Sequence, residues 1–464
     1  MAPIDRVLNY ADHNLPRGLD RLFEFLRFPS VGTDPQHHGD CLLAAKWLVV
    51  ELTSMGFSTS LRPTTGHPLV IGEYLPPGAG AATLHIVFYG HYDVQPADPL
   101  DLWDSPPFSP QIRASKPGRD SIFARGVSDD KGQVMTFLEA CRAVLAATGC
   151  LPFRLTVMIE GDEEGDNSHL DRFLKANRQE LKADIAFVCD TELWNDVTPG
   201  INIMLRGCIC EEVTIRGPRF DLHSGDFGGA VINPIRALSR ILADMHRSDG
   251  QVAIPGFYDG VRPLPPEVRK AWAKLRFPIK HYLGEVGLAL PAGEKAFTGL
   301  EQLWARPTAE INGIHGGYRG VGAKTVIPAE ATAKLSFRLV GGQNPKKVRK
   351  AFRNFVTARL PAGCRAVFTT QAGDSRGVTV SSTSQWVAAA RKSLTAEWGR
   401  GPVLMGSGAS IPVVESFKKY LGIDSLMVGF ARADDGQHSP NEKYDVDCFH
   451  KGIRSWARII SEFA

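Results

Sequence analysis

Short apolar runs alternate with helical patterns along the first 200 residues. Residues 83–89 (TLHIVFY), 153–159 (FRLTVMI) and 184–189 (DIAFVC) are apolar over the length of a strand, which is typical of strands buried on both faces. Between them, residues 40–56 and 133–147 repeat apolar positions at the spacing of a helix. This alternation predicts an α/β fold in which helices cover both faces of a sheet.

The pattern changes after about residue 207. Residues 208–216 (CICEEVTIR) and 331–340 (ATAKLSFRLV) alternate polar and apolar positions, as strands with one solvated face do. Helical patterns occupy 232–246 and 345–359, so this region has the character of a smaller α+β domain with an antiparallel sheet. The α/β pattern then returns, with a helix, a strand and a final helix predicted at 384–398, 424–430 and 446–462.

We therefore predict a discontinuous catalytic domain that carries an inserted α+β domain. The catalytic domain comprises residues 1–206 and 385–464, and the inserted domain comprises residues 207–384. A chain of 464 residues exceeds the size at which one hydrophobic core usually stops growing, which also favours two domains. In an α/β sheet the ligand site lies beyond the carboxyl ends of the strands, so residues that follow the apolar runs are the first candidates for function.

The composition is ordinary for a soluble globular protein, with 43% apolar and 22% charged residues. Lysine and arginine number 53 against 50 aspartates and glutamates, which gives no electrostatic reason to expect nucleic acid or an anionic membrane as a partner. No apolar run reaches the roughly 18 residues of a spanning helix, and the N-terminal segment lacks the apolar core of a signal peptide. The eight cysteines are scattered, so we expect free thiols and a cytoplasmic protein.

Two segments offer candidate ligands near strand ends and helix starts. GHYDVQP places His91 and Asp93 after the first apolar run, and a carboxylate beside a metal-binding imidazole fixes its tautomer. A buried histidine bonded to an aspartate explains this pair equally well.

RGVSDDKG places Asp129 and Asp130 at the start of a helix, where an aspartate commonly caps the helix by accepting a backbone N–H. One of the two can still cap while the other binds metal.

The segment EGDEEGDN directly follows the apolar run at 153–159, and four of its first five residues are acidic. At the end of a buried strand such carboxylates repel one another, and cations would offset the repulsion. A solvated surface would also tolerate them. Adjacent Glu163 and Glu164 allow one to bind metal while the other acts as general base. Asp190 ends the run at 184–189, where a turn residue is the alternative.

Two histidines complete the candidates. His438 lies in the turn-rich segment QHSPNEK, and His223 lies in FDLHSGDFGG within the predicted inserted domain. Taken alone, each segment is equally compatible with an ordinary loop histidine. The pair Cys208-x-Cys210 is too closely spaced for a usual zinc clip, so we interpret these cysteines as structural.

Together these segments resemble the M20 family of metallopeptidases, which includes carboxypeptidases, aminoacylases, dipeptidases and deacylases. The ordered set spans residues 90–443 and reads GHYDVQP, RGVSDDKG, EGDEEG, CDT, DLHSGDFGG, GAKTVIP, SFRLV, ASIP and HSPNEK. The carnosinase-like dipeptidase branch is the most similar, because of DLHSG, GAKTVIP and HSPNEKY. The resemblance implies a zinc-exopeptidase-like catalytic domain with an inserted lid and dimerisation domain.

The resemblance further implies two Zn²⁺ ions per subunit, for which Mn²⁺ or Co²⁺ could substitute. His91 and Asp190 correspond to ligands of one metal, and Glu164 and His438 correspond to ligands of the other. Asp129 corresponds to the carboxylate that bridges both. In relatives the peptide bond after this bridging aspartate is cis.

The other implied roles concern catalysis and the substrate. Glu163 corresponds to the general base, and Asp93 to the residue that orients the metal-binding histidine. His223 corresponds to a histidine that reaches into the partner's site of dimeric relatives, so we expect a homodimer formed through the inserted domain. Four positions match contacts to the substrate, or support for them: Arg338, which would grip a free carboxylate, Thr325, Ser410 and Asn233.

These observations predict a two-metal hydrolase that cleaves an amide next to a residue with a free carboxylate, with a metal-bridging water as nucleophile. A dipeptidase or carboxypeptidase-type exopeptidase is the leading interpretation. The alternatives are a deacylase or amidohydrolase acting on N-acyl or N-carbamoyl amino acids, and a non-catalytic metal-dependent binding protein. The sequence Gly406-Ser407-Gly408-Ala409 stands where the dipeptidase branch often has Arg-Glu-Gly-Gly, which leaves the exact substrate open.

Overall fold

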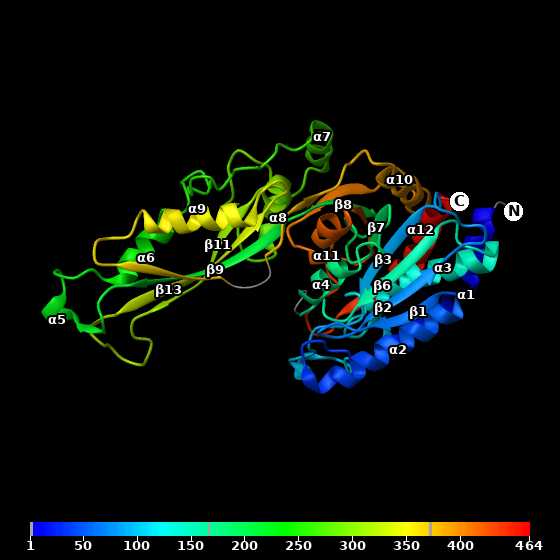
Figure 1. The fold of residues 1–464 in the computed structure, drawn as a ribbon, viewed down its shortest axis with the longest axis horizontal. Coiled ribbons are helices and arrows are strands. Elements are labelled where there is room, and N and C mark those ends of the chain that lie inside the picture. Colours follow the sequence, from blue (N-terminus) through cyan, green and yellow to red (C-terminus); the bar gives the residue numbers. More distant parts are fainter. Residues whose placement is uncertain (1–2, 166–167, 371–373) are drawn as a thin grey trace. The chain divides into compact units, whose positions relative to one another are not determined.

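The computed structural model describes residues 3–165, 168–370 and 374–464 (Figure 1). Within it the chain forms two compact units. Unit 1 comprises Met1–Ile203, Val380–Met405 and Ser416–Ala464, and unit 2 comprises Met204–Thr379 and Gly406–Glu415. Residues 406–415 therefore group with unit 2, whereas the sequence pattern placed them with the catalytic domain. The catalytic, lid and dimerisation roles of these units stay predictions.

A mixed sheet forms the centre of unit 1. Its strands follow one another in the order β1, β2, β6, β3, β7, β17 and β8. The neighbours β6, β3, β7 and β17 are parallel, because each is followed or preceded by a helical crossover. The strand bounds are β1 Ser58–Arg62, β2 Leu69–Tyr74, β3 His85–His91, β6 Arg154–Glu160, β7 Ile185–Val188, β8 Gly200–Leu205 and β17 Asp424–Met427. The predicted α/β fold is thereby confirmed.

Apolar helices and aromatic side chains cover this sheet. The helices α1, α3 and α12 pack against one another, and α2 lies against β1 and β2. Phe137 of α3 stacks on Phe88 of β3 with ring centroids 3.7 Å apart, and Trp456 of α12 contacts both Phe137 and Phe187. The helix bounds are α1 Pro3–Leu26, α2 His38–Ser54, α3 Lys131–Thr148, α4 Ser168–Ala176, α10 Gln385–Trp398 and α12 Val446–Ser461. This packing fixes α3, whose first turn follows the predicted metal ligand Asp129.

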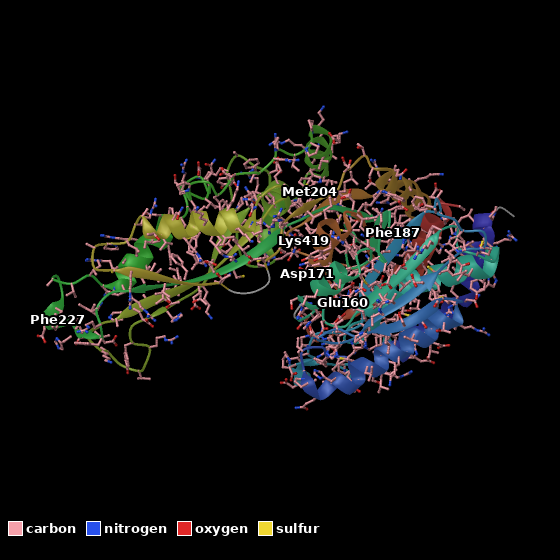
Figure 2. The ribbon with its side chains drawn as sticks, in the orientation of Figure 1. Glu160, Asp171, Phe187, Met204, Phe227 and Lys419 are labelled. Atoms are coloured by element: carbon pink, nitrogen blue, oxygen red, sulfur yellow. The ribbon has the colours of Figure 1, made fainter. Side chains whose placement is uncertain are left out.

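Polar contacts attach the shorter elements of unit 1. Asp171 of α4 accepts hydrogen bonds from Tyr420 at 2.9 Å and Lys419 at 3.3 Å, which ties α4 to the C-terminal segment (Figure 2). A separate three-stranded sheet has the order β18, β5, β4. It brings the segment after His438 beside the segment before Asp129. Its strands are β4 Gln111–Lys116, β5 Arg119–Phe123 and β18 Lys443–Asp445.

Unit 2 contains a four-stranded antiparallel sheet in the order β11, β13, β9, β14. Its alternating sequence buries Ile209, Val213 and Phe337 on the face that α6 and α9 cover (Figure 1). The bounds are β9 Gly207–Arg216, β11 Thr308–Gly316, β13 Glu330–Leu339, β14 Arg365–Thr370, α6 Pro234–Ala243 and α9 Pro345–Thr357. Smaller elements are β10 Leu222–His223, β12 Val326–Ile327, α5 Ser224–Phe227, α7 Pro266–Leu275 and α8 Ile279–Gly284. Among the described residues, no helix is long and apolar enough to cross a membrane.

Candidate metal centre

The predicted ligands of unit 1 gather at the carboxyl end of its parallel strands. His91 is the last residue of β3, and Asp190 lies two residues beyond the end of β7. Glu164 follows β6, and Asp129 lies just before α3. Since the carboxyl ends of parallel strands meet at one edge of a sheet, residues from distant parts of the chain converge there.

Two groups of side chains in the described residues could each hold a cation. His91, Asp129 and Asp190 form one group, and Asp129, Glu164 and His438 form the other; within each group the ligand atoms lie within 4.8 Å of one another. Asp129 belongs to both. Its Oδ1 lies 3.1 Å from His91 Nε2, and its Oδ2 lies 2.9 Å from His438 Nε2. One carboxylate thus presents a separate oxygen to each histidine, as a bridging ligand must.

Burial and mutual repulsion make this cluster of carboxylates unfavourable without positive charge. Burial, with the neighbouring Asp129, raises the pKa of Asp190 to about 7. Burial also opposes ionisation of Asp129, but hydrogen bonds from His438 and His91 lower its pKa below the ordinary value. The hydrogen bond to Asp129 and the neighbouring carboxylate of Glu164 raise the pKa of His438 to about 10. Positive charge beside these carboxylates therefore favours their ionised form.

The donor set fits divalent cations. Glu164 Oε1 is buried and has no hydrogen-bond partner of good geometry, although it lies 3.1 Å from His438 Nε2. A buried carboxylate oxygen without a partner is unfavourable, and a cation would satisfy it. Imidazole nitrogen and carboxylate oxygen are also the ligands that Zn²⁺ and similar ions prefer.

Asp93 supports the ligands through two kinds of contact. Its side chain is fully buried and accepts hydrogen bonds from the backbone N–H groups of Glu163 at 3.3 Å and Glu164 at 3.0 Å. His91 Nδ1 lies 3.0 Å from the backbone oxygen of Asp93 and 3.4 Å from its Oδ1. Asp93 therefore holds the glutamate pair with its carboxylate and contacts the histidine mainly through its main chain.

Glu163 projects from the same loop as the ligand Glu164. Its carboxyl group is buried, which raises its pKa well above the ordinary value, and the negative charge of Asp190 adds to this effect. Glu163 therefore lies beside the ligand Glu164 as the candidate general base.

The helix cap that the sequence offered as an alternative role for Asp129 or Asp130 is not made by Asp130. Asp130 occupies the N-cap position, but its side chain makes no capping hydrogen bond. It instead accepts the N–H of His91 at 3.2 Å. The peptide bond between Asp129 and Asp130 is cis, as the family resemblance implies.

Two supporting residues were missed from the sequence. Gln95 donates a hydrogen bond from Nε2 to Glu164 Oε2 at 2.7 Å, and its position four residues after His91 in the GHYDVQP segment was the available signal. Glu442 accepts the backbone N–H of Asp129 at 3.1 Å. Its place four residues after His438 gave no comparable signal, because nothing in the sequence pairs it with residue 129.

The remaining predicted site residues lie in unit 2. His223 is exposed, and its Nδ1 accepts the backbone N–H of Gly225 at 3.0 Å. Asn233 caps α6 by accepting the N–H of Ile235 at 2.9 Å. Arg338 lies on β13 and is half-buried, Thr325 is exposed in the segment before β12, and Ser410 is half-buried. These positions stay predictions as substrate contacts.

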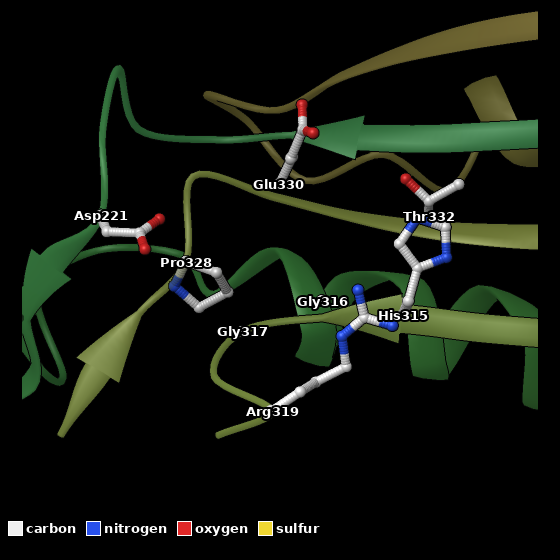
Figure 3. Close-up of a pocket in the computed structure, with 8 residues that line it drawn as sticks. All are labelled: Asp221, His315, Gly316, Gly317, Arg319, Pro328, Glu330 and Thr332. Atoms are coloured by element: carbon white, nitrogen blue, oxygen red, sulfur yellow. The ribbon is translucent and has the colours of Figure 1, made fainter. Parts of the chain in front are cut away.

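Unit 2 also contains a hollow of about 210 Å³ that the candidate ligands do not line. It lies at the ends of β11 and β13, with Arg319 and His315 on one side and Asp221 and Glu330 on the other (Figure 3). Two of its polar groups are already bonded within unit 2: Asp221 accepts the N–H of Ala329, and Glu330 pairs with Arg216. The hollow contains none of the predicted catalytic residues.

Comparison with known proteins identifies the family. Residues 87–462 match the sequence model of Peptidase family M20/M25/M40. A Cys-Gly metallodipeptidase of Schizosaccharomyces pombe is 30% identical over 99% of this chain and 98% of its own length. A Beta-Ala-His dipeptidase of Homo sapiens is 28% identical over 86% of this chain and 78% of its own length.

Solved structures agree with these relatives. The di-peptidase Dug1p from Saccharomyces cerevisiae superimposes with a TM-score of 0.79 at 27% identity and covers 100% of this chain and 99% of that chain. The M20 metallo-carboxypeptidase Sso-CP2 from Sulfolobus solfataricus gives a TM-score of 0.81 at 30% identity and covers 96% of this chain and 99% of that chain. The predicted resemblance is confirmed: the chain belongs to peptidase family M20/M25/M40 and is a metal-dependent peptidase of the dipeptidase type.

Proposed function

We propose that the cluster at the carboxyl end of the sheet holds two divalent cations, with zinc as the native metal. His91 and Asp190 bind the first, Glu164 and His438 bind the second, and Asp129 bridges both. The observation that carries this proposal is the position of Asp129, whose two oxygens face two different histidines. The mixed nitrogen and oxygen donor set favours zinc, and Mn²⁺ or Co²⁺ suits it as well.

We propose that the substrate is a dipeptide, cleaved at the amide next to a residue with a free carboxylate. The names of the relatives, Cys-Gly and Beta-Ala-His dipeptidases, support this class. Arg338 has no carboxylate within ion-pair distance among the described residues, so its guanidinium is available for a substrate carboxylate. Thr325 and Ser410 provide smaller polar contacts. Asn233 acts indirectly, because its side-chain oxygen caps α6 and so holds the segment after His223.

The reaction is hydrolysis assisted by general base catalysis. When bound, two such cations would polarise the scissile carbonyl and make the attacking water more acidic. Glu163 accepts one proton from the attacking water as the water oxygen adds to the carbonyl carbon. The C–N bond then breaks, and Glu163 returns the proton to the amine nitrogen that leaves. Asp93 keeps Glu163 in position through the backbone hydrogen bond described above.

His223 is proposed to stabilise the negative oxygen of the tetrahedral intermediate in the partner subunit of a homodimer. The hydrogen bond that its Nδ1 accepts from Gly225 leaves the neutral ring protonated at Nε2. This tautomer is a hydrogen-bond donor, as the role requires.

We further propose a cytoplasmic location, which the free state of all eight cysteines supports.

Glu163→Gln tests the proposed function. We expect loss of dipeptide hydrolysis by a factor of at least about 100 with zinc still bound, because the ligands are untouched. The panel contains dipeptides, N-acyl amino acids and N-carbamoyl amino acids. If the protein hydrolyses only N-acyl or N-carbamoyl amino acids, the proposed dipeptidase activity is wrong and the protein is a deacylase or amidohydrolase. A variant with unchanged activity would refute the role of Glu163, and a wild type that hydrolyses no amide in the panel would favour a binding protein.

Two further measurements test the metals and the dimer. Removal of metal with a chelator should abolish hydrolysis, and addition of one ion at a time should show which metals restore it. Sedimentation of the zinc-loaded protein should give a dimer. A monomer with full activity would contradict the proposed role of His223 in the partner's site.

A further inference from the structure

The carboxylate of Glu442 is buried against the backbone of the loop that carries Asp129. Its side chain is 1% exposed. Oε1 accepts the N–H groups of Ser128 at 2.8 Å and Asp129 at 3.1 Å. Oε2 accepts the N–H of Gly126 at 2.8 Å and Nη1 of Arg125 at 2.8 Å. One carboxylate thus receives four hydrogen bonds from four residues within the segment 125–129, three of them from the main chain.

Glu442 also belongs to the segment that carries His438. The backbone of that segment is unusual, because His438 and Asn441 have φ angles of 60° and 62°, a conformation that residues other than glycine rarely adopt. Asn441 is held by hydrogen bonds to the N–H of Asp104 at 2.8 Å and the carbonyl oxygen of Leu102 at 2.9 Å. The surrounding contacts therefore maintain a backbone that would otherwise be unfavourable.

Two ligands that must face each other thus come from segments that are more than 300 residues apart, and Glu442 joins those segments directly. Asp129 must turn one oxygen to His91 and the other to His438. A small rotation of the 125–129 backbone would move both oxygens at once. The N–H of Asp129 is bonded to Glu442, so the position of the bridging carboxylate depends on a contact with the His438 segment.

We propose that Glu442 is a positioning residue that fixes the spacing between Asp129 and His438 and so prepares the site for its cations before they bind. This inference rests on the metal role proposed above for Asp129. Residues that support metal ligands in this indirect way typically change metal affinity or activity 10- to 100-fold when altered. Arg125 contributes by neutralising the buried carboxylate, with 1% of its own side chain exposed.

Glu442→Gln is the informative variant, because the amide keeps the size of the side chain. The single oxygen of the glutamine amide can replace only one of the two carboxylate oxygens. The NH₂ group takes the place of the other oxygen and faces hydrogen-bond donors of the 125–129 loop, with which it cannot form a hydrogen bond. Asp445→Asn is the matched control. Asp445 is also fully buried in the C-terminal segment, but it is hydrogen-bonded to Ser121 and ion-paired with Arg432 and Arg119, none of which is a predicted metal ligand.

The probe is zinc alone, titrated against a coloured chelator, and the melting temperature of each metal-free protein is measured in parallel. Glu442→Gln should bind zinc about 10- to 100-fold more weakly than the wild type, and Glu442→Asp should recover part of this loss. Asp445→Asn should lower the melting temperature but leave zinc affinity within about threefold. Equal zinc affinity in Glu442→Gln and wild type would overturn the inference, as would an equal loss in both variants.

A second measurement uses the wild type and remains decisive if Glu442→Gln does not fold. If Glu442 prepares the loop, the amide hydrogens of Gly126, Ser128 and Asp129 should exchange slowly in the metal-free protein, and zinc should change their rates little. Fast exchange that slows only after zinc is added would mean that the metal organises the loop, and would overturn the inference. A wild type that binds no zinc would instead refute the metal centre proposed above, and this inference with it.

Discussion

Gly90 lies immediately before the ligand His91, and the structure leaves no room for a side chain there. A Cβ atom at this position would lie 2.4 Å from Cγ2 of Val134 and 2.8 Å from Oδ2 of Asp130. Both neighbours are fully buried. In Gly90→Ala the end of β3 and the first turn of α3 must therefore move apart. His91 lies at the end of β3, so this ligand is displaced as well.

The size of the effect follows from these contacts. Overpacking a core by one methyl group lowers the free energy of unfolding by about 1–3 kcal/mol. The collision with Asp130 also weakens the hydrogen bond that its carboxylate accepts from the N–H of His91, which adds about 1 kcal/mol. We expect Gly90→Ala to lose about 2–4 kcal/mol of stability. Because a ligand is displaced, kcat/KM should fall about 10- to 100-fold.

Val134→Ala provides the decisive comparison. Alone, it removes two buried methyl groups and should lower the free energy of unfolding by about 2 kcal/mol. In the double variant, the methyl group of Ala at 90 occupies part of the space that Val134 leaves. The combined loss should then be smaller than the sum of the single losses by about 1 kcal/mol or more.

Urea unfolding of the metal-free proteins measures these free energies, and dipeptide hydrolysis by the zinc-loaded proteins measures kcat/KM. Part of the activity lost in Gly90→Ala should return in the double variant. Losses that add within about 0.5 kcal/mol would refute the reasoning, because they would show that the two side chains do not compete for the same space.

Three other outcomes follow from the structure. Asp93→Asn should lower both zinc affinity and kcat about 10- to 100-fold, since an amide cannot accept both backbone N–H groups of the glutamate pair; zinc titration and steady-state kinetics measure this. Asn233→Ala should lower the free energy of unfolding by about 0.5–2 kcal/mol through loss of the α6 cap, whereas Asn233→Asp should keep the cap and the stability. An increase in KM without loss of stability would contradict the role of Asn233 as a helix cap. Burial opposes ionisation of Asp434, but Lys116 and Lys443 lower its pKa from 3.8 to about 2, so its contribution to stability is present above about pH 4 and is lost as the pH falls towards 2. Urea unfolding between these pH values should therefore show a weaker acid dependence in Asp434→Asn than in the wild type.

The sequence was most informative where local pattern and burial coincide. The runs at 83–89, 153–159 and 184–189 appear as β3, β6 and β7 with shifts of one or two residues. Strands buried on both faces must be apolar throughout, so a polar residue directly after such a run is conspicuous. This is why His91 and Asp190 could be named as candidates from the pattern, whereas their roles as metal ligands came from the family resemblance.

Contacts between distant segments were not accessible in the same way. Glu442 is an ordinary polar residue in its own segment, and its importance depends on main-chain donors more than 300 positions earlier. Residues 406–415 likewise have no local pattern that assigns them to unit 2. For the pair Asp129 and Asp130 the sequence favoured a helix cap because that role is local, whereas Asp130 accepts the backbone N–H of His91 at the end of β3.

The order of the strands has a consequence for biosynthesis. The partner of β7 on one side is β17, which leaves the ribosome about 240 residues after β7, or roughly 10 to 50 s later at usual rates of translation. During that interval β7 is a fully apolar strand with one unpaired edge, a template for association with other chains. Nascent chains that stop within unit 2 should therefore depend on chaperones, and a truncated chain that ends before residue 424 should aggregate.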